Sequence, residues 1–362
     1  MEKNMAENIV INKIPSPTWS WLKMNKSSVE LGSDFLNALP SSEKIPEGAE
    51  KRNASKFFEY PLYTKLTSAA GKEFASFADS LEGIEPAFYE LSGKIAEPIV
   101  FNFNVPGGER LLNKTFFHVN EDCECTVIFL FSADEAASGF FVSTTSFILE
   151  KNAKLHVVKA QILGKEHSYI DDTRFACGEN ASAEFSQVEL GAGLAYSAVS
   201  SELLEYKSNF KLNLGYYCEN TNLLDINHVV NQYGKKTACL MRVKGTLSGQ
   251  AKKTYRGTID FKCGCAGSTG DEQEETLLLS PEVVNNSIPV ILCDEEDVSG
   301  EHGASIGRVS DEVLFYMKSR GVSKKEAEKL LARAKVQSVA SLICDQDVLE
   351  SVEKRMDEVF GR

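Results

Sequence analysis

Three short segments decide the fold: AKLHVV (residues 153–158), ASAEFS (181–186) and SNFKLN (208–213). They can be laid over one another so that Leu155, Ala183 and Phe210 coincide, at offsets of 28 and 27 residues. Short alternating runs at a near-fixed spacing, separated by polar turns, predict either a solenoid whose coils stack on one another or a β-sandwich. Periodicity alone leaves both architectures open.

The same texture extends from residue 97 to residue 305, where runs rich in Val, Ile, Phe, Thr and Tyr alternate with polar residues. We expect this stretch to be the β core. Residues 1–96 are interrupted by prolines and predict a mixed, partly helical region, with its best helix around 62–81. Residues 306–362 have helical periodicity and predict a C-terminal helical region.

Helix signals in this last region are specific. Ser310 is placed to cap a helix, and Gly321 is placed to end it. Ser323 and Glu326 match a capping box for a second helix. The apolar residues of that second helix fall on one face: Ala327, Leu330, Leu331 and Ala334. A third helix is expected to start near Asp345 or Asp347.

Composition excludes several function classes. The 362 residues carry 39 Lys+Arg and 52 Asp+Glu, and the formal charge of -13 argues against a nucleic-acid partner. No apolar run approaches the roughly 18–20 residues that span a bilayer. The first residues carry charges of both signs and lack the apolar stretch of a secretory signal. The nine cysteines are an odd number, which argues against a disulfide framework. We therefore expect a cytoplasmic protein with reduced thiols and no membrane partner.

Two Cys-x-Cys pairs, Cys123 with Cys125 and Cys263 with Cys265, are the first candidates for metal chemistry. Zinc sites usually separate paired cysteines by two to four residues, so buried thiols are the favoured interpretation. A metal-storage protein would require the two pairs to converge in space. The acidic run at residues 271–275 is interpreted as a solvated loop.

His302 differs from the other four histidines, which are dispersed along the chain. It lies in what we interpret as a loop, residues 294–308, where Gly300 and Gly303 allow unusual backbone geometry. Acidic neighbours such as Glu301 can orient its imidazole. No GxxxxGK[ST] or GxSxG motif is present in the sequence, so we expect neither an NTPase nor a serine hydrolase of that type.

The region from Lys244 onward resembles the SufB/SufD family of the Suf iron–sulfur cluster assembly system. Several separate blocks carry the resemblance: Lys244-Gly-Thr-Leu247, Tyr255-Arg-Gly-Thr-Ile259, Leu277-Leu-Leu-Ser280, Ser287-Ile-Pro289, Asp297-Val298, His302-Gly-Ala-Ser-Ile-Gly-Arg308 and Leu314-Phe-Tyr-Met-Lys-Ser-Arg-Gly321. The resemblance implies a right-handed parallel β-helix flanked by N-terminal and C-terminal helical regions.

Within the family this chain looks most like SufD. It has the His302-Gly303-Ala304 form of the motif, and it has Glu282 near the position that we align with the functional cysteine of SufB-like chains. Two features depart from the SufD pattern. Glu301 is similar to SufB, and the acidic run at residues 271–275 replaces a glycine–glutamine run.

The resemblance implies a non-catalytic scaffold that pairs with SufB through the β-helix and binds the ATPase SufC through the C-terminal helices. It implies a homodimer as a form of the isolated chain, a transient iron–sulfur cluster on the complex, and a flavin as a further cofactor that the complex could carry. His302 is then the candidate cluster-assembly residue, supported by Glu301. The partner-binding candidates lie on the C-terminal helices: Phe315, Tyr316, Arg320, Leu330 and Leu331.

Two alternatives remain beside this one. The apolar stripe of the C-terminal helices would also suit packing against the solenoid. A parallel β-helix polysaccharide lyase or hydrolase would also be long, mainly β and repetitive. Such an enzyme would normally be exported and would need a basic or metal-binding groove for an acidic substrate, and the acidic charge of this chain argues against that groove.

Overall fold

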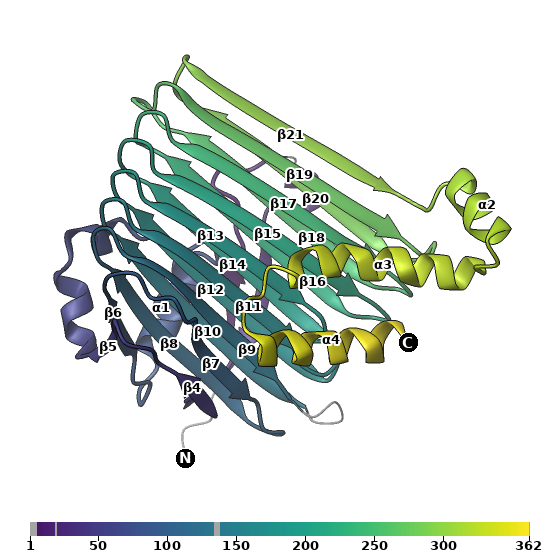
Figure 1. The fold of residues 1–362 in the computed structure, drawn as a ribbon, viewed down its shortest axis with the longest axis horizontal. Helices are drawn as coiled ribbons and strands as arrows, with labels where there is room; N and C mark the ends of the chain where they lie inside the picture. The colour runs from purple at the N-terminus through teal and green to yellow at the C-terminus, as the bar shows by residue number, and fades with distance from the viewer. Residues whose placement is uncertain (1–5, 19, 134–137, 362) are drawn as a thin grey trace.

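The computed structural model describes residues 6–18, 20–133 and 138–361. Two large sheets dominate it, and successive strands alternate between them (Figure 1). The even-numbered parallel strands form the first sheet: β6 (Ala87–Leu91), β8 (Arg110–Val119), β10 (Gly139–Leu149), β12 (His167–Cys177), β14 (Leu194–Leu203), β16 (Leu223–Gln232), β18 (Lys252–Phe261) and β20 (Val284–Cys293). The odd-numbered strands form the second: β7 (Ile99–Asn104), β9 (Glu124–Ser132), β11 (Lys154–Ile162), β13 (Ser182–Glu189), β15 (Asn209–Cys218), β17 (Ala238–Leu247), β19 (Ser268–Leu278) and β21 (Val298–Gly307).

Each coil of the chain therefore contributes one strand to each sheet and pairs in parallel with the coils on either side. The overlay of the three quoted segments is the observed register: Leu155 pairs with Ala183, and Ala183 pairs with Phe210. The mainly β, parallel solenoid architecture is confirmed, and the β-sandwich alternative is wrong.

One corner of each coil repeats the same left-handed backbone conformation. Asp122, Asn152, Asn180, Lys207 and Lys236 occupy equivalent positions there, with φ between 56° and 59°. Asn and Asp adopt this region more readily than most residues. The corner side chains also form a ladder, because the Asn152 amide donates to Asp122 at 2.9 Å and the Asn180 amide donates to Asn152 at 2.8 Å. The corner thus aligns each coil with the next.

The main core lies between the two sheets. Aromatic rings stack along the solenoid in its first half, with centroids 4.8 Å apart for Phe117 and Phe147, 5.0 Å for Phe147 and Phe175, and 5.1 Å for Phe101 and Phe129. These rings come from inward positions that repeat from coil to coil. Stacked repeats of this kind bury one continuous apolar stripe, which a single coil could not bury alone.

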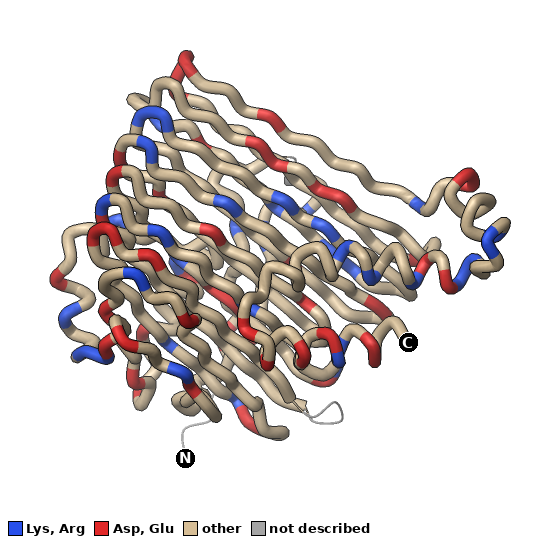
Figure 2. Tube along the Cα trace, in the orientation of Figure 1, with Lys and Arg blue, Asp and Glu red and all other residues tan. Residues whose placement is uncertain are grey.

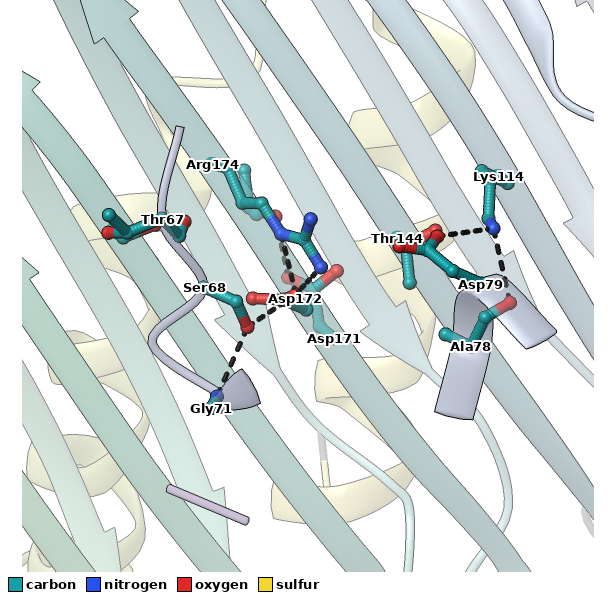
Figure 3. Close-up of polar contacts among 12 residues, drawn as sticks. Thr67, Ser68, Gly71, Ala78, Asp79, Lys114, Thr144, Asp171, Asp172 and Arg174 are labelled. Atoms are coloured by element: carbon teal, nitrogen blue, oxygen red, sulfur yellow. Dashed lines mark hydrogen bonds and ion pairs between the residues drawn. The ribbon is translucent and has the colours of Figure 1, made fainter. Parts of the chain in front are cut away.

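The N-terminal region covers the outer face of the even sheet. It contains β1 (Glu7–Ile11) paired with β2 (Ser27–Leu31), β3 (Leu36–Asn37), the 3-10 turns η1 (Ser20–Leu22), η2 (Ala54–Glu59) and η3 (Pro61–Lys65), and α1 (Lys72–Ser80). Polar contacts hold it in place (Figure 3): Lys114 Nζ donates to Asp79 at 2.8 Å, and Ser68 Oγ donates to Asp172 at 2.9 Å. Arg174 also donates to Asp172, from Nε at 2.8 Å.

The helix expected around residues 62–81 is shorter than the sequence suggests. Residues 61–65 form the 3-10 turn η3, and α1 begins only at Lys72, after Gly71 with φ of 109°. The apolar spacing was nevertheless informative, because Ala70, Phe74 and Ala78 are buried against the even sheet.

Helices α3 (Lys324–Ala340) and α4 (Gln346–Phe360) cover part of the odd sheet, whereas α2 (Asp311–Ser319) projects beyond it (Figure 1). The Ser310 cap, the capping box of Ser323 with Glu326, and the Asp345 cap of α4 are all present. The buried face of α3 differs from the stripe that the sequence predicted. Of the four predicted residues, only Ala327 is fully buried. The other buried residues of α3 are Ala332, Val336, Val339 and Ala340.

The two ends of the solenoid are finished differently. At the first end, two short antiparallel strands rich in charge border the sheets: β4 (Ser42–Lys44) against β7 and β5 (Ala49–Arg52) against β6. At the other end, β20 and β21 are edge strands of ten residues each, and no described strand pairs with their outer edges. We call β20 and β21 the open end.

Candidate functional site

His302 lies in β21, at the open end, rather than in a loop. The flanking glycines do not have left-handed backbone conformations; they are needed for close packing. A Cβ at Gly300 would meet Phe261 at 2.9 Å and Ile291 at 3.3 Å, on the core side of the strand. A Cβ at Gly303 would meet Gln273 at 2.6 Å, on the opposite side. Because residues two apart share a face, His302 lies on the core side of an exposed edge strand.

Glu301 lies on the other face of β21. It is in register with Asp271 of β19, and both residues line a shallow groove on the outer face of the odd sheet. Adjacent residues in a strand point to opposite faces, so Glu301 faces away from the imidazole that it was expected to orient. The residue in register with His302 is Glu272.

Acidic residues 271–275 belong to β19, which corrects their interpretation as a solvated loop. Asp271 and Glu275 face outward, where Asp271 accepts from Arg242 at 2.5 Å and Glu275 accepts from Lys335 at 3.1 Å. Glu272 and Glu274 face inward and are each 2% exposed. The two sets alternate in burial with a period of two, but all five residues are polar, so the sequence pattern could not reveal the strand.

A buried polar cluster therefore lies in the coil next to His302. Glu274 pairs with Lys253 and accepts a hydrogen bond from Ser287. The Glu272 carboxylate occupies the space beside Gly257, where a Cβ would overlap it, and its Oε2 accepts no hydrogen bond from the residues that the structure describes. Burial raises the pKa of Glu272 from its ordinary 4.5 to about 7. The inside of the open end thus holds ionisable groups next to an exposed histidine.

The partner-binding candidates gather beyond the C-terminal end of β21, around α2 and the first turns of α3. Phe315 is 76% exposed, Tyr316 60% and Leu330 52%. The Arg320 guanidinium lies 5.4 Å from the centroid of the Tyr316 ring. Leu331 is partly buried and lines a groove of about 400 Å³ between α2, α3 and β19. We call α2 and residues 320–331 the head.

The stretch that contains the head, residues 308–335, is basic in an otherwise acidic protein (Figure 2). Residues 308–335 contain eight Lys and Arg against four Asp and Glu, whereas the whole chain has a formal charge of -13. Exposed aromatic and aliphatic side chains with basic neighbours suit a protein partner whose contact surface is acidic at its rim.

The two Cys-x-Cys pairs do not converge. Cys123 and Cys125 are buried at the start of β9, while Cys263 and Cys265 follow β18, several coils away. Within the described ranges, no group of three or more His, Cys, Asp and Glu residues is arranged to hold a metal ion. The convergence that a metal-storage protein required is therefore contradicted.

These features define the class: a parallel β-solenoid with one bordered end, one open end that carries a histidine, and an exposed helical head. The family model described as "SUF system FeS cluster assembly, SufBD core domain" matches residues 103–335. The chain belongs to this SufBD family. No helix in the described part of the chain is long and apolar enough to cross a membrane.

Curated relatives carry both family names. The iron-sulfur cluster assembly protein SufD of Bacillus subtilis is 28% identical over 130 residues, which cover 36% of this chain and 29% of that protein. SufB of the same species is 23% identical over 329 residues, covering 79% and 70%. A SufBD family protein of Staphylococcus epidermidis is 23% identical over 309 residues, covering 80% and 62%. The match to SufD thus spans less than a third of that relative's length.

The raised pKa of Glu272 makes a prediction about pH. Between pH 4.5 and about 7 the folded chain keeps a proton on Glu272 that the unfolded chain releases. The free energy of unfolding contributed by this group therefore falls as pH rises, by up to about 3 kcal/mol. When the free energy of unfolding of Glu272→Gln is measured with urea between pH 4.5 and about 7, this part of the decline should be absent. The exposed-site control Glu121→Gln should keep it, and parallel curves for all three proteins would contradict the assignment.

Proposed function

We propose that this chain is a non-catalytic scaffold subunit of a Suf complex, in which iron–sulfur clusters are the cargo. It pairs with a SufB-like solenoid through the open end and binds a SufC-type ABC ATPase through the head. The difference between the two ends of the solenoid carries this proposal. The family favours this role over a polysaccharide lyase or hydrolase.

Edge strands expose unpaired N–H and C=O groups, and proteins usually protect them with short strands, charges or covering segments. The first end has such protection in β4 and β5, which carry Glu43, Lys44, Lys51 and Arg52. The open end has two long strands whose only ionisable side chains besides Cys293 are Glu301 and His302. Such long edge strands with few charges are suited to pairing with the edge strands of another solenoid. Both sheets would then continue across the interface. The same edges would pair two copies when the SufB-like partner is missing.

His302 would then lie at the interface between the two solenoids. A neutral imidazole can bind iron or accept a proton, so the residue suits a ligand that acts while the cluster is being assembled. Its exposure on an edge strand leaves it accessible to groups from the partner chain. Glu301 faces the outer surface of the odd sheet, so we assign it no part in holding the imidazole. The flavin stays a prediction for the complex.

The head would bind the ATPase, because its aromatic residues are exposed and lie on a helix outside the two-sheet core (Figure 1). The contacts of α3 divide the two roles that its apolar residues could take. Ala332, Val336 and Val339 pack on the odd sheet, whereas Leu330 points into solvent and is available to a partner. Movement of the ATPase could thus be transmitted to the solenoid through α3.

Pairing through the open end is tested by placing a charged side chain on its edge strand β21. Ile306 is 42% exposed, so Ile306→Lys should leave the fold intact and place a charge on the pairing strand. Size-exclusion chromatography should then show loss of the complex with the SufB-like protein. Ser42→Lys on β4 is the matched control at the bordered end, and it should assemble normally. Normal assembly of Ile306→Lys would contradict pairing through this edge.

The head is tested separately. Phe315→Asp should weaken binding of the SufC-type ATPase by about tenfold or more in isothermal titration, because it replaces an exposed aromatic anchor with a charge. Tyr206→Asp is the control, since Tyr206 is 42% exposed on a coil corner away from the head. If the two variants bind the ATPase equally well, the head is not the binding surface.

The role of His302 is tested by His302→Ala. Because the side chain is exposed, folding and co-purification with both partners should stay near wild type. The visible absorbance of the cluster reconstituted on the complex should fall. His302→Asn distinguishes a structural role, which would show as a lower melting temperature or weaker complex formation. A full cluster yield from His302→Ala would remove this residue from the assembly site.

A further inference from the structure

The loop between β1 and β2, residues 12–26, crosses the outer face of the even sheet; we call it the strap. Its base is fixed by one buried carboxylate. Asp225 of β16 accepts hydrogen bonds from Asn12 Nδ2 at 2.7 Å, from Ser27 Oγ at 2.5 Å and from Arg256 Nη1 at 2.6 Å. Arg256 is 1% exposed and belongs to a motif of the family resemblance that the proposed function leaves unused.

Contacts of the strap advance toward the open end as the chain approaches its tip. Asn12 lies against β16, and the next contact is one strand further, where Arg256 Nε of β18 donates to the Met24 carbonyl at 2.7 Å. The two arms of the strap are joined at this level, because the Ile14 amide donates to the Asn25 carbonyl at 3.0 Å. Thr18 then donates to the Asn25 side chain, with its backbone N–H at 3.1 Å. The tip of the strap, of which the structure describes residues 15–18 and 20–23, continues from the level of β18.

The next strand in this direction is β20, the edge of the even sheet. Ile288 and Val290 of β20 are in register with Arg256 and Thr258 of β18, on the outer face. They are only 7% and 8% exposed, although they belong to an edge strand. The strap contacts the outer face of the adjacent strand β18, so we place its tip over these two residues, at the open end.

The tip of the strap carries exposed apolar side chains. In η1, Trp21 is 73% exposed and Leu22 is 38% exposed. Tryptophan is the residue type most enriched among those that dominate binding energy at protein interfaces. A tryptophan on a segment fixed by a buried ion pair is also partly pre-organised for binding, which reduces the ordering cost.

We infer that the strap tip is part of the open-end interface, with Trp21 as an apolar anchor for the partner solenoid. This inference rests on the proposed pairing through β20 and β21 and extends that interface from the sheet edges onto the outer face of the even sheet. Its occupant is a second β-solenoid chain, because the tip is continuous with an edge that needs strands as partners. Arg256 acts as a positioning residue, since it holds the base of the strap over β18.

Intrinsic fluorescence tests the inference, because the chain has only two tryptophans, Trp19 and Trp21. In a Trp19→Phe background, Trp21 is the single reporter when a tryptophan-free SufB-like partner is added. Its emission should shift to shorter wavelength and acrylamide quenching should fall. The SufC-type ATPase alone should produce neither change. A complex that forms by light scattering without any change at Trp21 would overturn the inference and leave the proposed pairing intact.

A binding series gives the second readout. Trp21→Ala should raise the Kd for the SufB-like partner by about tenfold or more and leave the circular dichroism spectrum unchanged. Leu39→Ala is the matched control, since Leu39 is also 73% exposed but lies beside β3, toward the bordered end. Equal affinity of the two variants would overturn the inference. Failure of wild-type protein to form the complex would overturn the proposed pairing itself, and the inference with it.

Discussion

Every strand of the solenoid depends on a neighbour in another coil, because a coil contributes one strand to each sheet and cannot complete either alone. The corner residues maintain that arrangement. Their left-handed backbone conformation recurs from Asp122 to Lys236, and hydrogen bonds between successive corner side chains keep neighbouring coils aligned. Stacking of this kind has no natural stop, so each end must be closed by other segments or by another molecule.

The remaining architecture follows from how the chain closes those ends and covers the two outer faces. Short charged strands border the first end, and the N-terminal region and α3 with α4 cover the outer faces. The open end and the head stay exposed. They lie on different elements, so two partners could bind at the same time. In the proposed scaffold, the covered faces keep the solenoid rigid while the open end and the head make contacts.

Sequence reasoning succeeded where the signal was local and repetitive. The overlay of Leu155, Ala183 and Phe210 was the true register, and the caps of the C-terminal helices were read from short motifs. It failed where a face had to be assigned. Glu272 and Glu274 were interpreted as solvated because nothing near them in sequence shows their burial, and Lys253, the ion-pair partner of Glu274, is distant in sequence. Glu301 was paired with His302 because adjacency in sequence conceals opposite directions in a strand. The position of the strap could not be predicted, since the hydrogen bond that holds its base joins Asn12 to Asp225, which are 213 residues apart in sequence.

Hydrogen exchange at the open end tests the central claim most directly. Amides on the outer edge of β21 should exchange quickly in the isolated monomer and become protected when the SufB-like protein is added. Amides of β4, at the border of the same sheet, should exchange at the same rate with and without the partner. Formation of the complex with β21 still exchanging freely would contradict the claim that this edge is the surface through which the scaffold pairs.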